Sequence, residues 1–182
     1  MFGILRESIV KATLQVINEM QAAGVIGRYA IGGAVGATFY LEPAATLDID
    51  IFVSIQPPPG SLLLSLQPIY DYLVTGRQCR QEGEYIVVEG WQVQFLPPGD
   101  AMGEEALAQA LETEVDGVRT WVMTAEHLVA LALQLGRGKD YARILQFIEA
   151  GELDTTRLDQ ILTRYNLLAK WELFGDRFLK NQ

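Results

Sequence analysis

The chain has 182 residues, of which 49% are hydrophobic and 20% are charged, and its formal net charge is -9. That composition predicts a globular protein with a sizeable core, and the acidic balance argues against binding of bulk DNA, which depends on Lys and Arg. The single cysteine, Cys79, excludes an intramolecular disulfide and a zinc cluster. Because no apolar run approaches the ~20 residues that cross a bilayer, and residues 1–7 lack a signal-peptide core, we expect a cytoplasmic protein that does not bind membranes.

The first half of the chain mixes helical and strand patterns. The predicted elements, in chain order, are a helix over 4–23, a strand over 28–31, a helix over 34–40, a strand over 47–54, a helix from Ser61 to Leu73, and strands over 78–80, 85–88 and 91–96. A Gly32-Gly33 turn connects the first strand to the short helix, and the prolines over 57–59 predict a break.

The second half is mostly helical. Helices are expected over 100–111, 124–135, 139–149, 157–165 and 167–179, with one strand over 118–122. Thr124 and Asp154 are expected to cap two of these helices. Together the halves predict an α/β (α+β) fold, with a short mixed sheet and flanking helices over 1–98 and a helical part over 99–182 that packs on it or forms one domain with it.

Two aspartates occupy alternate positions of the second predicted strand. Because strand side chains alternate between faces, Asp48 and Asp50 project to one side while Ile49 and Ile51 project to the other. Two carboxylates on one face repel each other unless a cation or a basic group neutralises them. Mg²⁺ prefers a few carboxylates together with substrate phosphates, so the pair predicts a magnesium site. A solvated edge strand with incidental acids is the alternative interpretation.

A diglycine precedes this pair along the chain. Gly32 and Gly33 permit backbone angles and close approaches that a Cβ would block. At a helix start they leave N–H groups free to bind a phosphate. A plain tight turn is the alternative for a glycine pair. Beside a magnesium site, the diglycine predicts binding of a nucleoside triphosphate.

This arrangement resembles the signature of the nucleotidyltransferase superfamily, which has the polymerase-beta-like fold. The shared features are a diglycine, a short helix, and Asp48-Ile49-Asp50 in a hydrophobic strand. More narrowly, the chain resembles the bacterial nucleotidyltransferase-like group related to the AbiEii abortive-infection toxins. Three later segments carry the narrower resemblance, and they are Trp91–Pro97, Thr124–Leu128 and Gly136–Tyr141. The resemblance spans residues 28–171.

The resemblance implies a magnesium-dependent transfer of a nucleoside monophosphate from an NTP to a hydroxyl on RNA, protein or a small molecule. It implies that Asp48 and Asp50 hold one or two magnesium ions and carry the catalysis. It assigns nucleotide binding to Gly32, Gly33, Thr46, Arg137 and Lys139. Arg137 or Lys139 would contact phosphate or pair with Asp140, and a surface ion pair without function is the alternative. An antitoxin protein partner and an RNA acceptor held at one local site are also implied.

The chain departs from the family pattern at the expected third carboxylate, where Gln94 stands. A neutral amide cannot deprotonate an acceptor hydroxyl, so Glu42, Glu84 or Glu89 would have to reach the site instead. This departure supports a second hypothesis, a catalytically degenerate nucleotidyltransferase-fold protein that acts as a nucleotide-binding or partner-binding module. The single histidine, His127, is expected to be a buried helix residue rather than a base.

Overall fold

The structure of the protein, a computed structural model, describes residues 2–42, 48–55 and 64–180, with side chains described from residue 10 onward. The helices are α1 (Phe2–Ala22), α2 (Gly33–Ala37), α3 (Gln67–Tyr70), the π-helical turn η1 (Asp71–Gly76), α4 (Ala101–Ala108), α5 (Ala125–Leu135), α6 (Gly138–Ala150), α7 (Thr155–Arg164) and α8 (Leu168–Phe178). The strands are β1 (Tyr29–Ile31), β2 (Asp48–Val53), β3 (Arg80–Glu82), β4 (Tyr85–Val88), β5 (Trp91–Leu96), β6 (Leu111–Val115) and β7 (Val118–Val122).

The strands of the described residues form one seven-stranded sheet in the order β3-β4-β5-β2-β1-β7-β6. β2 runs parallel to β5 and antiparallel to β1, and β1 runs parallel to β7. The other neighbouring strands pair in antiparallel fashion. β2 therefore lies in the middle of a mixed sheet, between a strand that precedes it and a strand that follows it in the chain. The predicted mixed α/β fold is confirmed.

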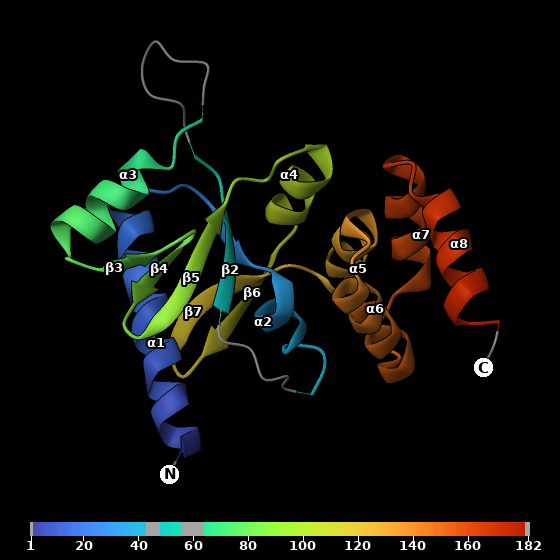
Figure 1. Ribbon diagram of the computed structural model, residues 1–182, viewed down its shortest axis with the longest axis horizontal. Coiled ribbons are helices and arrows are strands. Elements are labelled where there is room, and N and C mark those ends of the chain that lie inside the picture. The colour runs from blue at the N-terminus through green and yellow to red at the C-terminus, as the bar shows by residue number, and fades with distance from the viewer. Residues whose placement is uncertain (1, 43–47, 56–63, 181–182) are drawn as a thin grey trace.

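Hydrophobic cores cover the two faces of the sheet. On one face, α1 packs through residues such as Leu14 and Ile17 against buried strand residues such as Ile51, together with α3 and η1. On the other face, Ala30 of β1 joins residues of α2, α4 and the helices α5–α8. Figure 1 shows α1 and α3 toward one end of the molecule and α5, α6, α7 and α8 gathered at the other. The sheet therefore separates two helical layers.

Side-chain caps begin three of the helices. The side chains of Asp100, Thr124 and Asp154 each accept a hydrogen bond from the backbone N–H three residues later. Such a bond satisfies one of the N–H groups that the first helical turn leaves without a partner. The two caps predicted from the sequence, Thr124 and Asp154, are confirmed.

The prediction of a helix over 100–111 was wrong at its end. α4 ends at Ala108, and Leu111–Val115 forms β6, which pairs with β7. Asp116 and Gly117 between the two strands have positive φ angles of 50° and 81°, which suit a two-residue hairpin turn. Pairing with β7 thus outweighs the helical pattern of the preceding residues.

Other predicted boundaries also shift, and the short helix expected over 34–40 ends at Ala37. The helix expected to begin at Ser61, which lies outside the described residues, begins at Gln67, with Pro68 in its first turn. Proline lacks an N–H and is therefore favoured at that position. The strand predicted over 78–80 begins at Arg80 instead, because Gln78 has a φ of 57°, in the left-handed region that strands exclude.

The sheet continues past residue 98, since β7 and β6 extend it beyond β1. The division of the chain into units over 1–98 and 99–182 stays a prediction. In the part of the chain that the structure describes, no helix combines the length and the apolar character needed to span a membrane.

Candidate functional site

β2 presents its two aspartates on one face of the sheet. Burial alternates along this strand, so that Ile49, Ile51 and Val53 are at most 1% exposed while Asp48 and Asp50 are partly exposed. The prediction that both carboxylates lie on the same face is confirmed. This face belongs to the side of the sheet that carries α2 and α5, opposite α1.

The diglycine lies directly against Asp50. Gly33 has a φ of +57°, and a Cβ at Gly33 would lie 1.8 Å from Oδ2 and 2.7 Å from Cγ of Asp50. The N–H of Gly32 donates to the backbone carbonyl of Asp50 at 2.9 Å. A Cβ at Gly32 would lie 2.6 Å from the Phe52 ring. Glycine is therefore required at both positions for the β1–α2 turn to approach β2 this closely.

β5 places two amides beside the two aspartates. In the parallel register, Gln92 lies opposite Asp48 and Gln94 lies opposite Asp50. Gln92 is also held in place, because its Nε2 donates to Oε2 of Glu82 at 2.9 Å. The residue beside Asp50 on the neighbouring strand is thus neutral.

The acids considered as substitutes for a third carboxylate do not join the pair. Glu42 is exposed, and Glu89 is exposed in the turn between β4 and β5. Glu84 is exposed and forms a hydrogen bond with Tyr85. Within the described residues, no three His, Cys, Asp or Glu side chains group together in a way that could hold a metal ion.

Electrostatics at the pair combine repulsion and attraction. Burial raises the pKa of Asp50, and the neighbouring charge of Asp48 raises it further. Three cations, Arg143, Lys139 and Arg137, act in the opposite direction on the pKa of Asp50. All three come from the start of α6, about 90 residues later in the chain. The helical part therefore supplies positive charge to the strand that carries the aspartates.

Arg137 and Lys139 differ in how they are engaged. Nε of Arg137 lies 2.6 Å from Oδ2 of Asp140, and its Nη2 lies 3.2 Å from Oδ1 of the same fully buried carboxylate. Asp140 also accepts from the Arg137 backbone N–H at 3.2 Å, so its side chain satisfies a backbone donor at the start of α6. Arg137 thus forms the predicted pair with Asp140. Lys139 is exposed, and its predicted contact with phosphate stays a prediction.

Sequence reasoning missed two residues near the pair. Arg143 lies four residues after Lys139, one helical turn further along the same face of α6. Tyr85 precedes Ile86, which pairs with Val93, so it shares the face of Gln94. Burial raises the pKa of Tyr85, and the charges of Asp48, Glu84 and Asp50 add to that rise. The four-residue spacing on the helix and the alternation along β4 indicate which residues share a face, but not that these faces meet the aspartates.

The donor set at β2 fits a magnesium ion. Carboxylate oxygens are ligands that Mg²⁺ prefers, and Mg²⁺ commonly completes its coordination with waters and substrate phosphates. A cation would also relieve the repulsion between Asp48 and Asp50 that contributes to the raised pKa of Asp50. Thr46, the remaining residue predicted to bind nucleotide, lies outside the described residues.

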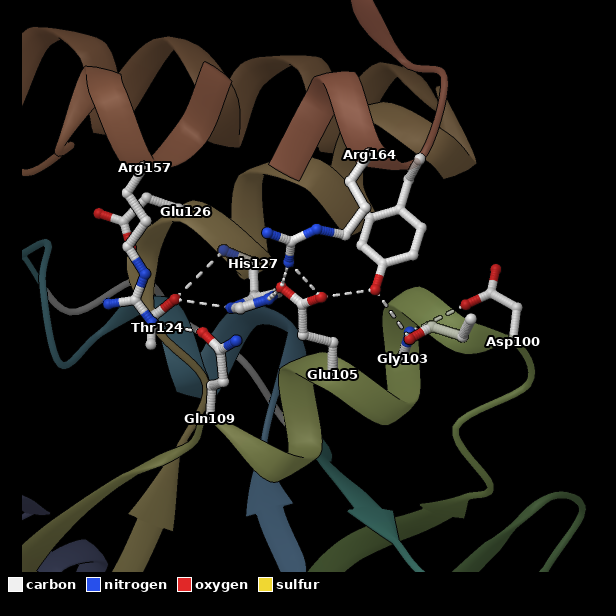
Figure 2. Close-up of polar contacts among 11 residues, drawn as sticks. Asp100, Gly103, Glu105, Gln109, Thr124, Glu126, His127, Arg157 and Arg164 are labelled. Atoms are coloured by element: carbon white, nitrogen blue, oxygen red, sulfur yellow. Dashed lines mark hydrogen bonds and ion pairs between the residues drawn. The ribbon is translucent and has the colours of Figure 1, made fainter. Parts of the chain in front are cut away.

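A second polar cluster lies between α4, α5 and α7 (Figure 2). His127 is fully buried, with Nδ1 2.9 Å from Oγ1 of Thr124 and Nε2 3.4 Å from Oε1 of Glu105. Glu105 also accepts from Nη1 of Arg164 at 2.5 Å and from the hydroxyl of Tyr165 at 2.7 Å. Burial lowers the pKa of His127 more than Glu105 raises it. His127 is therefore a buried helix residue, as expected.

A groove of about 590 Å³ lies between α6 and α8, away from the aspartates. Tyr141, Phe174 and Phe178 supply its aromatic wall. Tyr141 lies on the opposite side of α6 from Lys139, since residues two apart on a helix point about 200° apart. We therefore assign the candidate site to the face of β2 rather than to this groove.

Comparisons with known proteins support the fold. No protein-family model matches the sequence, and no curated protein matches it. Among solved structures, the chain is similar to an antigenic nucleotidyltransferase-like protein from Paracoccidioides brasiliensis, with a TM-score of 0.58 and 14% identity. The match covers 92% of this chain and 90% of that one. The chain thus has a nucleotidyltransferase-like fold, while its place in the group related to AbiEii stays a prediction.

Proposed function

We propose that the protein transfers a nucleoside monophosphate from an NTP to an acceptor in a magnesium-dependent reaction. The observation that carries this proposal is the pair of carboxylates on one face of β2, with Gly33 in direct contact with Asp50. Like charges on one strand face destabilise a fold. Their retention beside a glycine turn is explained if they bind a cation together with a phosphate.

The residues around the pair have complementary roles in such a reaction. Asp48 and Asp50 would hold Mg²⁺, which when bound would neutralise charge on the transferred and leaving phosphates. Lys139 and Arg143, whose charges act on Asp50, would bind the nucleotide phosphates. Gly33 keeps the space above Asp50 clear of side-chain atoms. Catalysis would then come mainly from positioning and charge neutralisation.

Label transfer from [α-³²P]NTPs in a cell lysate with Mg²⁺ tests this function. The wild-type protein is expected to label an acceptor. The Asp48→Asn/Asp50→Asn variant is expected to reduce labelling by at least about 100-fold, because loss of a residue that merely supports a metal ligand already costs about 10–100-fold. The matched control is Asp116→Asn/Asp159→Asn, which removes two exposed aspartates from a turn and from α7. Equal labelling by the wild type and the β2 variant would refute the proposal.

A second candidate is nucleotide binding without turnover, and the neutral Gln94 opposite Asp50 favours it. Without a third carboxylate, a hydroxyl acceptor has no obvious base. Calorimetry separates the candidates: magnesium-dependent NTP binding without label transfer selects this one. If no NTP binds at all, both fail and a partner-binding module is left.

A further inference from the structure

A chain of polar contacts crosses β3, β4 and β5 and ends beside the aspartate pair. Within β3, Oε1 of Glu82 lies 2.7 Å from Nη2 of Arg80. Oε2 of the same carboxylate accepts from Nε2 of Gln92, on β5, at 2.9 Å. The intervening strand, β4, contributes Val87, which pairs with both Arg80 and Gln92 and has no polar side-chain atom. Glu82 is thus held at both of its oxygens and reaches across β4 to the Gln92 amide.

This contact determines which end of the Gln92 amide faces β3. An ionised carboxylate only accepts hydrogen bonds, so the group of Gln92 that meets Glu82 is its NH₂ group. In the strand order β3-β4-β5-β2, Glu82 and Asp48 lie on opposite sides of β5 (Figure 1). Because Nε2 is directed toward β3, the amide oxygen Oε1 is left on the side of β2. Gln92 therefore presents an acceptor oxygen toward Asp48.

The strand register brings this oxygen within reach of an ion held by the aspartates. Gln92 lies directly opposite Asp48 in the parallel β2–β5 pair, and the two side chains stand on the same face of the sheet. Neighbouring strands lie about 4.8 Å apart. Two oxygens that each bind one Mg²⁺ at about 2.0–2.1 Å lie at most about 4.2 Å apart. A small convergence of the two side chains closes that difference.

Gln94, the other amide of β5 on this face, lacks such a support. It lies opposite Asp50, but in the part of the chain that the structure describes its amide has no hydrogen-bond partner to orient it. An amide that is free to rotate must lose conformational entropy when it binds an ion. The Gln92 amide is already oriented by Glu82 and has less entropy to lose.

We infer that Gln92 is a third ligand of the divalent ion at β2, through its amide oxygen, and that Glu82 is the positioning residue that orients it. This inference deepens the proposed function and rests on it. Carbonyl and carboxylate oxygens together suit Mg²⁺ and Mn²⁺. A neutral amide adds a ligand without adding a third negative charge to Asp48 and Asp50.

Stability alone does not account for the chain of contacts. The side chains of Arg80 and Glu82 are 73% and 36% exposed, and exposed ion pairs contribute little to the free energy of unfolding. A residue that orients a metal ligand, by contrast, commonly changes metal affinity by about 10–100-fold. Metal affinity and stability therefore distinguish a positioning role for Glu82 from a merely structural one.

Binding of Mn²⁺ to the nucleotide-free protein, followed by the EPR signal of the free ion, tests the assignment of Gln92 without an enzyme assay. Gln92→Met keeps the approximate length of the side chain and removes its amide, and we expect about a tenfold loss of Mn²⁺ affinity. Gln94→Met is the matched control, since it makes the same change opposite Asp50, and its loss should be much smaller. Equal losses for the two variants, or no loss for Gln92→Met, would overturn the inference.

A double-mutant cycle separates positioning from charge. Glu82→Ala should weaken Mn²⁺ binding while the urea midpoint of the metal-free protein stays close to that of the wild type. In a Gln92→Met background, Glu82→Ala should cause no further loss of affinity, because the amide that it orients is absent. Losses that multiply in the double variant would show that Glu82 acts through its charge alone and would overturn its positioning role.

The Asp48→Asn/Asp50→Asn variant distinguishes failure of the inference from failure of the proposed function. It is expected to abolish Mn²⁺ binding, which the proposed function also requires. Equal binding of Mn²⁺ by this variant and the wild type would overturn the proposed function together with the inference. If the aspartates are required but Gln92→Met and Glu82→Ala bind Mn²⁺ as the wild type does, the inference alone is overturned.

Discussion

Two polar clusters of this molecule contain similar residues but arrange their charges differently. Between α4, α5 and α7, the carboxylate of Glu105 faces Arg164, Tyr165 and His127, so each of its oxygens has a donor (Figure 2). On β2, Asp48 and Asp50 share a face, and burial with mutual repulsion raises the pKa of Asp50. One cluster pairs opposite charges, whereas the other brings like charges together.

This difference separates a stabilising cluster from a candidate binding site. Hydrogen bonds to a charged group contribute about 1.5–3 kcal/mol each, so the cluster around Glu105 is expected to hold the helices together. Like charges on one strand face lower stability, and perturbed carboxylates of this kind concentrate at functional sites. Removing a charge should therefore have opposite effects on stability in the two clusters.

The largest effect is expected from adding one methyl group at the β2 site. Gly33→Ala combines a left-handed φ with a Cβ 1.8 Å from Oδ2 of Asp50, and we expect a loss of about 3 kcal/mol in the free energy of unfolding. Gly151→Ala is the matched control, because Gly151 has a φ of +71° with no atom near its Cβ position. It should lose only about 1 kcal/mol in denaturant unfolding.

A double-mutant cycle isolates the contact itself. In an Asp50→Ala background, Gly33→Ala should lose about 1 kcal/mol, as the control does, which gives a coupling of about 2 kcal/mol between the two residues. Equal losses in both backgrounds would show that the turn conformation alone, and not the contact with Asp50, requires glycine.

The next effect concerns the paired cluster. Glu105→Gln keeps the shape of the side chain and removes its charge, so Arg164 and His127 lose a charged partner. We expect a loss of about 2 kcal/mol in the free energy of unfolding. Glu104→Gln changes the exposed neighbour on α4 and should change stability by less than about 0.5 kcal/mol. A loss below 0.5 kcal/mol for Glu105→Gln would contradict the stabilising role of the cluster.

The pH dependence of the free energy of unfolding should have opposite signs for the two clusters. The pKa of Asp50 is raised in the folded state, so this group lowers stability as the pH rises through that pKa. Asp50→Asn should therefore exceed the wild type by about 0.5–1 kcal/mol at pH 7, and the advantage should vanish at acidic pH.

The pKa of Glu105 is shifted in the opposite direction from that of Asp50. Burial raises the pKa of Glu105, but hydrogen bonds from Tyr165 and Arg164 outweigh it, and the net shift is downward. The stability that Glu105 contributes is thus present above its unfolded pKa and is lost as the pH falls through its folded pKa. Urea unfolding of both variants between pH 3 and 8 checks these signs. An Asp50→Asn protein less stable than wild type at pH 7 would contradict the repulsion on β2.

The sequence predicts those features of the site that depend on local periodicity. Alternation along β2 places Asp48 and Asp50 on one face, and the adjacent Gly33 follows from the need for close approach. The caps Thr124 and Asp154 are also local signals. β6 was missed because a strand at the sheet edge depends on its partner β7 rather than on its own pattern.

Features that depend on tertiary packing were beyond such reasoning. The sheet order β5-β2-β1 joins strands from separate parts of the chain, and no local pattern predicts it. Arg143 acts on Asp50 only because α6 docks near β2. Tyr85 was overlooked for the same reason, since its place beside Gln94 depends on the register of β4 with β5.

A comparably small effect, on nucleotide binding rather than on stability, is expected from these distant cations. Lys139→Gln and Arg143→Gln should each weaken magnesium-dependent NTP binding about fivefold, or ~1 kcal/mol, because each removes one charge that reaches the β2 site. Stability should hardly change for the exposed Lys139.

Lys11→Gln removes a charge from α1, on the opposite face of the sheet, and is the matched control. Calorimetry at two salt concentrations measures the effect, which should shrink as salt screens the charges. Equal affinity for Lys139→Gln, Arg143→Gln and Lys11→Gln would mean that α6 neutralises Asp50 in the free protein without contacting the nucleotide.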